Sequence, residues 1–207
     1  MARTRQQPFR LDSLHLVALS ILLIFASVTA HAQVSLRVRG TIEAFDGNVL
    51  SVKTREGKDL QLKLGEKAVV VAAKAMKLED LKAGDYVGTT TTAGAAGALV
   101  AVEIHTLGPT VPQGHIPWDL QEGSMMTNGN IGTVVQSAGA QQLTLEYKGG
   151  SQKIIVPPGT PVVTNTPADR SALKPGEYVF TTAQVAADGT MIVQRIQVSR
   201  DGVKPPQ

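Results

Sequence analysis

The side chains best suited to binding chemistry gather in residues 114–119, a segment that reads GHIPWD and contains the only tryptophan of the chain. His115 and Asp119 lie four positions apart, so in a turn their side chains can share a hydrogen bond or a ligand. Trp118 adds a large ring that either contacts a ligand or packs in a groove between two folded units. We therefore expect a ligand-binding site at His115, Trp118 and Asp119.

A metal site is the alternative interpretation of this part of the chain. His105, His115, Asp119 and Met126 offer imidazole, carboxylate and thioether groups, which are donors that transition metals accept in proteins. The chain has no cysteine, its only histidines after residue 32 are His105 and His115, and no HxH or HxxxH pair occurs. Zinc sites take three or four protein ligands, which this set supplies only with a carboxylate. We predict no resident metal or other cofactor and keep a metal-handling accessory protein as an alternative function.

Catalysis has weaker support in the sequence. Ser124, His115 and Asp119 are the residue types of a hydrolytic triad, but Ser124 does not stand in a Gly-x-Ser-x-Gly turn. The glycine-containing segments at residues 94–97 and 186–189 lack the lysine of a phosphate-binding loop, so we expect hairpin turns there. We predict that the protein is not an enzyme, and an envelope hydrolase is the second alternative.

The elements that would position these residues belong to an internal repeat. The segment LKAGDYVGTT at residues 81–90 returns as LKPGEYVFTT at residues 173–182, with seven of ten positions identical. The same spacing of 92 positions aligns residues 40–42 with residues 132–134. We interpret the repeat as a duplicated unit whose shared residues shape a turn: a leucine anchors it in the core, a glycine supplies a positive φ and a tyrosine begins a strand. These structural positions are Leu81, Gly84, Tyr86, Leu173, Gly176 and Tyr178.

Each unit predicts about five short strands, because apolar residues recur at every second position in runs that end at Gly, Asn or Asp. A short helical segment is expected between the third and fourth strands of each unit, and this combination is typical of an OB-like barrel. The predicted fold class is all-β, with two tandem five-stranded barrels joined by a linker that contains Pro and Gly. Its predicted parts are a first barrel at residues 33–107, a linker at 108–129, a second barrel at 130–200 and a disordered tail at 201–207.

Residues 1–32 have the three-part pattern of a secretory signal peptide. Three arginines lie within the first ten residues, an apolar run follows at residues 16–25, and small residues stand at Ala30 and Ala32. Cleavage before Gln33 would deliver the chain to the periplasm of a Gram-negative cell, or outside the cell, without a stable membrane span. An uncleaved membrane anchor is the alternative.

The charge balance argues against nucleic acid as a partner. The chain has 20 basic and 17 acidic residues and a pI of about 9.2, but three of the arginines and one aspartate lie in the predicted signal peptide. The rest has 17 basic and 16 acidic residues, so its net charge is about +1. A nucleic-acid surface requires a clustered basic face that neutralises phosphates. We expect the partner to be a periplasmic protein or an envelope ligand.

The repeated motifs resemble a bacterial secreted domain-of-unknown-function family with tandem OB-like β-barrel repeats. In that family a strand that begins Gly-x-Val or Gly-x-Ile leads through a Leu-Lys-x-Gly-Asp turn to a final strand. Residues 114–119 and 126–128 also look like exported proteins that automated naming calls metal ABC transporter permeases, although a permease crosses the membrane several times. The resemblance implies the fold, and together with the composition it favours an exported binding or scaffolding module. It is carried by residues 40–42, 50–52, 81–90 and 100–104.

Overall fold

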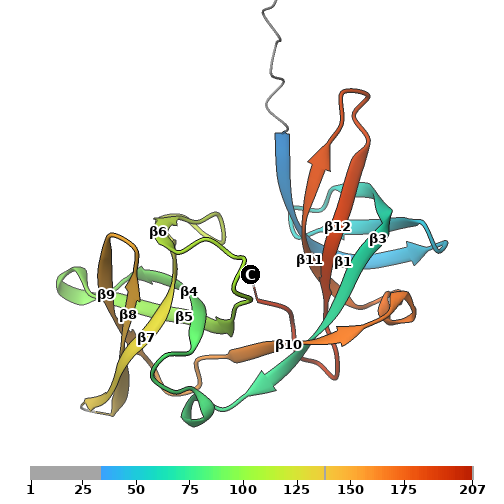
Figure 1. Cartoon of the computed structure of the whole chain (residues 1–207). Coiled ribbons are helices and arrows are strands. Elements are labelled where there is room, and N and C mark those ends of the chain that lie inside the picture. The colour runs from blue at the N-terminus through green and yellow to red at the C-terminus, as the bar shows by residue number, and fades with distance from the viewer. Residues whose placement is uncertain (1–33, 138, 207) are drawn as a thin grey trace, which may run out of the picture. The chain divides into compact units, whose positions relative to one another are not determined.

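The computed structural model describes residues 34–137 and 139–206, so the predicted signal peptide lies outside the described residues (Figure 1). The described chain is all-β, as predicted: its helical elements are three single-turn 3-10 helices, η1 (Leu78–Asp80), η2 (Ala95–Gly97) and η3 (Arg170–Ala172). Its strands are β1 (Val34–Phe45), β2 (Val49–Thr54), β3 (Asp59–Met76), β4 (Tyr86–Ala93), β5 (Leu99–Thr106), β6 (Gly114–Pro117), β7 (Met125–Ser137), β8 (Ala140–Tyr147), β9 (Gly150–Val156), β10 (Val162–Ala168), β11 (Tyr178–Val185) and β12 (Met191–Val198).

Alternation of apolar and polar residues positions the strands as the sequence predicts. On β1, Val38 and Ile42 are each only 1% exposed and point into a core, while Arg39 and Thr41 point to the other face. β1 turns into β2 at Gly47, whose φ is +100°. The Asp46 carboxylate accepts hydrogen bonds from the backbone N–H groups of Asn48 and Val49 at 2.8 and 2.7 Å. The residues Asp46-Gly47-Asn48 are typical of a hairpin turn, and this turn is held by the usual aspartate hydrogen bonds.

The first closed barrel, which we call barrel A, is the ring β1, β2, β3, β12 and β11. Neighbouring strands pair antiparallel, except that β12 pairs parallel with β3. β1 to β3 come from the first repeat and β11 and β12 from the second. Leu173, from the turn that opens the last part of the second repeat, is 3% exposed in this core. Its buried neighbours are Val38, Ile42, Leu50, Val52, Leu62, Leu64, Val70, Ala72, Val179, Ala183, Val193, Ile196 and Val198.

The second ring, barrel B, consists of β4, β5, β9, β8 and β7. It closes through a short parallel pairing in which Leu99 and Val100 of β5 lie opposite Ile154 and Ile155 of β9. β4 and β5 come from the first repeat, and β7 to β9 come from the second. The core of barrel B contains Leu81, Val87, Ala101, Ile104, Ile131, Leu143, Leu145, Ile154, Val156 and Val162.

The two repeats therefore exchange their last two strands, and the predicted division into contiguous barrels at residues 33–107 and 130–200 is corrected. Each barrel takes three strands from one repeat and two from the other. From Val34 onward the chain is a single compact unit. The chain passes between the barrels through β3 and η1 in one direction and through β10 and η3 in the other.

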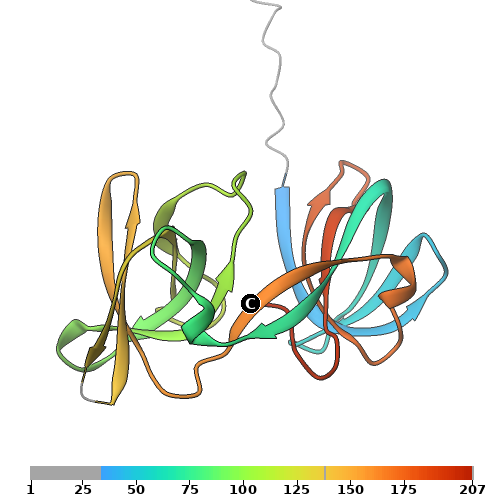
Figure 2. The same ribbon diagram turned by 60° about the horizontal axis from the view of Figure 1, so that its bottom comes forward.

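The two crossing strands pair with each other around a local two-fold axis (Figure 2). In the antiparallel register of β3 and β10, Val70 lies opposite Ala168, Ala73 opposite Asn165 and Met76 opposite Val162. The repeat spacing of 92 positions makes Val162 the counterpart of Val70 and Ala168 the counterpart of Met76. Each repeat therefore presents the same segment to the other, which is the self-complementary pairing of a two-fold dimer within one chain.

The physical origin of the exchange lies in the continuity of β3. This strand runs for 18 residues, and after Gly65 it contains no glycine or proline that would turn it back. The β-branched run at residues 69–71 favours an extended backbone. β3 therefore continues out of barrel A, and pairing with β10 satisfies the backbone groups of both crossing strands.

The expected helical segments and the expected disordered tail both differ in the structure. The expected helical segments, at residues 74–81 and 166–173, each begin with three strand residues, because β3 extends to Met76 and β10 to Ala168, and each holds a single 3-10 turn. The tail prediction is wrong for residues 201–206. Arg200 and Val203 exchange backbone hydrogen bonds, and Pro205 and Pro206 are buried.

The turn at Gly84 and Gly176 docks on the first strand of the opposite repeat. The N–H of Ile42 donates to the carbonyl of Glu177 at 2.8 Å, and the N–H of Gly176 donates to the carbonyl of Ile42 at 2.9 Å. Ile131 makes the same two bonds with Asp85 and Gly84, at 2.9 and 2.7 Å. Gly84 and Gly176 have φ values of +92° and +90°, the positive values that the turn was expected to need.

These bonds correct the alignment of the first strand of each repeat. Ile131 is the counterpart of Ile42, a spacing of 89 positions, and both side chains are 1% exposed. The repeat spacing of 92 positions instead aligned Val134 with Ile42, but Val134 is 41% exposed. The β-bulge after Ile42 recurs after Ile131, which supports the same correction.

Candidate binding sites at the loop and the junction

The segment predicted as a linker does not join the two barrels. It connects β5 to β7, which are both strands of barrel B, and part of it forms β6, which pairs with β7. β7 begins at Met125, so the predicted linker range of 108–129 overlaps a barrel strand. We call residues 107–124 the β5–β7 loop.

Ser124 holds the end of this loop in shape. Its hydroxyl lies within hydrogen-bond distance of the carbonyl oxygens of Trp118 (2.9 Å) and Gln121 (2.7 Å), and its own carbonyl accepts the Trp118 N–H at 2.8 Å. The residue is 2% exposed. Ser124 therefore bonds to backbone groups of a turn, and the structure does not place it in a triad with His115 and Asp119.

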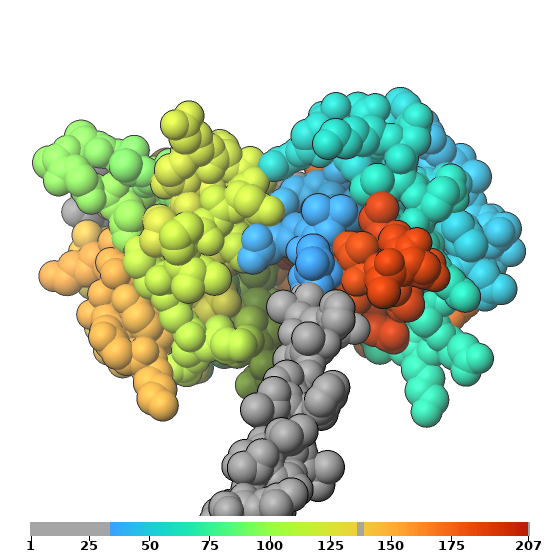
Figure 3. Space-filling view, turned by 90° about the horizontal axis from the view of Figure 1, so that it is seen from above, coloured from blue at the N-terminus to red at the C-terminus, as the bar shows by residue number. Residues whose placement is uncertain are grey.

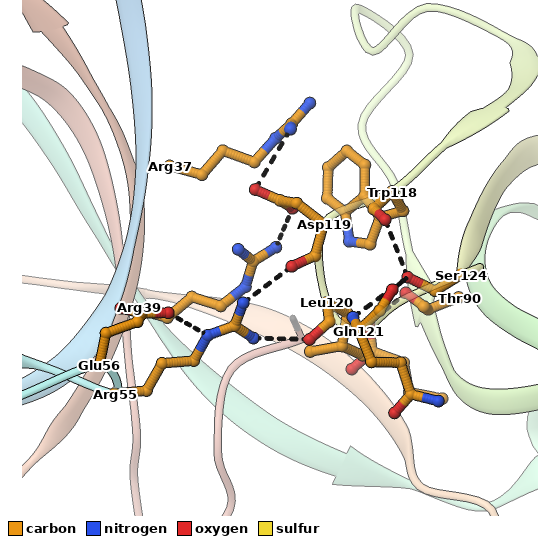
Figure 4. Close-up of polar contacts among 11 residues, drawn as sticks. Arg37, Arg39, Arg55, Glu56, Thr90, Trp118, Asp119, Leu120, Gln121 and Ser124 are labelled. Atoms are coloured by element: carbon orange, nitrogen blue, oxygen red, sulfur yellow. Dashed lines mark hydrogen bonds and ion pairs between the residues drawn. The ribbon is translucent and has the colours of Figure 1, made fainter.

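Three arginines of barrel A bind the tip of the loop (Figure 4). Arg39 donates to one carboxylate oxygen of Asp119 at 2.9 Å, and Arg37 lies 3.5 Å from the other. Arg55 donates to the backbone carbonyls of Asp119 and Leu120, at 2.8 Å each. The Arg37 guanidinium stacks over the Trp118 ring at 4.0 Å from its centroid. Trp118 and Asp119, two of the three predicted ligand residues, thus bind side chains of barrel A.

The Asp119 carboxylate is held in its charged form. Partial burial by itself would raise its pKa, but the hydrogen bond from Arg39 and the charges of Arg39 and Arg37 outweigh this effect and keep the pKa below its usual range. Arg39 is 4% exposed and also lies over the Phe180 ring at 4.8 Å. Asp119 therefore neutralises a nearly buried guanidinium, a contact that fixes the loop on β1.

His115 has different partners from Asp119. Its Nδ1 lies 2.8 Å from the Thr127 hydroxyl, and its ring stacks near Tyr147 with the centroids 6.5 Å apart. Partial burial lowers its pKa. His115 thus lies on the β6–β7 pair of barrel B, whereas Asp119 and Trp118 contact barrel A.

A buried polar pair on β5 was not predicted as a site. Glu103 and His105 are 7% and 8% exposed, and the Thr90 hydroxyl donates to Glu103 at 3.1 Å. His105 Nδ1 lies 3.7 Å from the Glu103 carboxylate and has no hydrogen-bond partner among the described residues. Gly88 leaves room for the imidazole, since a Cβ there would lie 2.6 Å from its Nε2. The only sequence signal for this pair is that charged residues alternate with apolar ones in a buried strand.

The weaker metal set is not assembled. Within the described residues, no group of three or more His, Asp or Glu side chains is arranged to hold a metal ion. Asp119 is paired with arginines, and Met126 is 3% exposed on β7. The structure therefore does not bring His105, His115, Asp119 and Met126 around one point.

A pocket of about 570 Å³ lies where the crossing strands meet β5, the β5–β7 loop and the C-terminal tail; we call it the junction pocket. Most of its lining is apolar, with Ala75 of β3, Val102 of β5 and Leu120 of the loop among the contributors. Glu103 and Lys204 are its charged residues. Both repeats and the ordered tail therefore build the junction pocket.

The buried His105 predicts an acid-sensitive fold. Burial lowers its pKa to about 4, from about 6.5 when unfolded. Between these values the unfolded chain binds a proton that the folded chain does not, so the stability present above pH 6.5 falls as the pH approaches 4, by about 3 kcal/mol in all.

His105→Gln, which copies Gln197 at the equivalent position, should remove this contribution. We expect the unfolding free energy of the unaltered protein to fall about 2 kcal/mol more than that of the variant between pH 6.5 and about 4.5. Denaturant titrations at both pH values measure the difference. Parallel losses in the two proteins would show that His105 is not buried in its neutral form.

Comparisons of the chain with family models, with curated proteins and with solved structures found no match. Among the described residues, no helix has the length and apolar character needed to cross a membrane.

Proposed function

We propose that the protein is an exported, non-catalytic binding or scaffolding module of the cell envelope, and that its ligand occupies the junction pocket. The observation that carries this proposal is the pocket itself, because a largely apolar cavity of about 570 Å³ with few charged groups has the size and lining of a small-ligand site. The hydrogen bonds from the arginines to the β5–β7 loop support the proposal, because they hold in place the loop that supplies Leu120 to the pocket wall. Export through residues 1–32 and membership of the secreted OB-like family are parts of the same proposal.

The lining indicates the chemical class of the ligand. An apolar body would bury its surface against Ala75, Val102 and Leu120. The Lys204 side chain is exposed and lies over the Tyr178 ring at 5.0 Å, so an ammonium group stands beside the apolar wall. This pairing favours an amphiphile with an apolar body and an anionic group.

The test uses anilinonaphthalene sulfonate, a fluorescent probe with an apolar body and one negative charge. The chain that begins at Gln33 should bind the probe saturably, with energy transfer from Trp118, which lies two positions from the pocket wall. Ala75→Phe should weaken binding at least about tenfold, which is about 1.4 kcal/mol, by filling the pocket.

Ala44→Phe is the matched control, because Ala44 is exposed on β1 and does not line the junction pocket. It should leave probe binding unchanged. Absence of saturable binding, or equal weakening by the two variants, would contradict the proposed site.

A further inference from the structure

One edge of β1 in barrel A is open. Ile42 directs both its N–H and its carbonyl toward the turn before β11. On the opposite side of β1, the carbonyl of Arg39 accepts a hydrogen bond from the backbone N–H of Arg55. Because backbone groups alternate along a strand, Ser35 and Arg37 direct theirs to the same side as Arg39. Pairing with β2 ends at Gly40, and the described residues hold no strand opposite residues 35–37 on that side.

The equivalent edge in barrel B is occupied. By the corrected spacing of 89 positions, Ser35, Arg37 and Arg39 correspond to Ser124, Met126 and Asn128. Along those residues of β7 runs the extended β6, with Ile116 opposite Met126 and Gly114 opposite Asn128. The ladder continues where the Trp118 N–H donates a hydrogen bond to the carbonyl oxygen of Ser124. In barrel B, the edge that corresponds to the open edge of β1 therefore accepts an added strand.

The open edge of barrel A carries positive charge. A pocket of about 330 Å³ separates residues 36–39 of β1 from the β2–β3 hairpin. Arg37, Arg39, Arg55 and Lys58 line it, against the acidic Glu56 and Asp119. Asp119 already demonstrates that a carboxylate binds this arginine face. Figure 3 shows the blue residues at the start of β1 at the surface, beside the yellow-green β5–β7 loop.

We propose that residues 35–39 of β1, here called the β1 edge, are a docking site for an extended acidic segment of a partner protein. The segment adds a strand to β1 as β6 does to β7, with main-chain hydrogen bonds for affinity and carboxylates toward the basic side chains for selectivity. Val34 and Leu36, which are 64% and 40% exposed, offer apolar contacts to its alternate side chains. This site is separate from the junction pocket.

The test measures fluorescence anisotropy with a labelled short peptide of alternating glutamate and valine and the chain that begins at Gln33. We expect saturable binding that weakens about tenfold in Lys58→Glu, a surface variant in the basic pocket. The matched control, Lys67→Glu, changes an exposed lysine outside this pocket and should alter affinity by less than about twofold.

Two further arms separate strand addition from simple charge attraction. Ser35→Pro removes only an N–H that faces the open edge and should also weaken binding, with the fold checked by circular dichroism. A peptide with an N-methyl group on every residue should not bind, because neither of its edges has an N–H to donate to the ladder. Equal binding of the methylated peptide, or no binding of either peptide, would overturn the proposal. Concentration-dependent dimers that Ser35→Pro abolishes would assign the edge to a second copy instead.

Discussion

Replacing Gly129 by alanine is expected to lower the unfolding free energy by about 3 kcal/mol or more. A Cβ at this position would lie 2.6 Å from the backbone carbonyl oxygen of Glu146 on β8, a contact that only a shift of the strand could relieve. Gly40, its counterpart in barrel A, has the same restriction, since a Cβ there would collide with the backbone oxygen of Lys53. Gly40→Ala should therefore cost a similar amount.

Gly132→Ala is the matched control, because Gly132 is the residue that the sequence comparison aligned with Gly40. Its added Cβ would meet only the carboxylate end of the Glu146 side chain, which can rotate away, so the cost should stay below about 1 kcal/mol. Urea titrations of the three variants measure these losses. Equal losses at Gly129 and Gly132 would contradict the corrected register.

Much of the local structure followed from residue pattern. Alternation placed Val38 and Ile42 inside a barrel, and Asp46 and Gly47 are residue types typical of the turn between β1 and β2. The duplicated turn was found because its glycine needs a positive φ and its leucine needs a core, two requirements that belong to single residues. Such features depend on residues that are close together in the sequence, so they can be predicted from one sequence.

The exchange of strands could not be predicted in the same way. Leu173 would contact equivalent residues whether its strand closed its own barrel or the other one, because the two repeats share the same apolar positions. Only the path of the connection differs, and that path depends on β3 continuing through residues 66–76. The alignment of the two repeats also matched Gly40 with Gly132, where two consecutive residues are identical, rather than with its structural counterpart Gly129.

The candidate site shows a similar division. The sequence singled out Trp118 and Asp119 as ligand-binding residues, but their arginine partners lie on β1 and in the β2–β3 turn, far away in sequence. Glu103 and Lys204 were missed, since neither belongs to a motif and only the fold brings them to one pocket. Residue type identified the side chains that are able to bind a ligand. Tertiary contacts decide which of them are already engaged by other groups of the protein.

The account depends most on the strand exchange, which predicts how the protein behaves when the chain is cut. A protease recognition sequence inserted between Pro109 and Thr110 falls in an exposed part of the β5–β7 loop. Cleavage would give one fragment with β1 to β5 and another with β6 to β12, and neither contains all the strands of a closed barrel.

Native size-exclusion chromatography with light scattering, before and after cleavage, measures the outcome. The exchanged fold predicts that the two fragments remain a one-to-one complex with the mass and circular dichroism of the uncut protein, and separate only in denaturant. The uncut insertion variant is the control for the inserted sequence. Two fragments that separate without denaturant and each retain a folded β spectrum would show contiguous barrels and contradict the account.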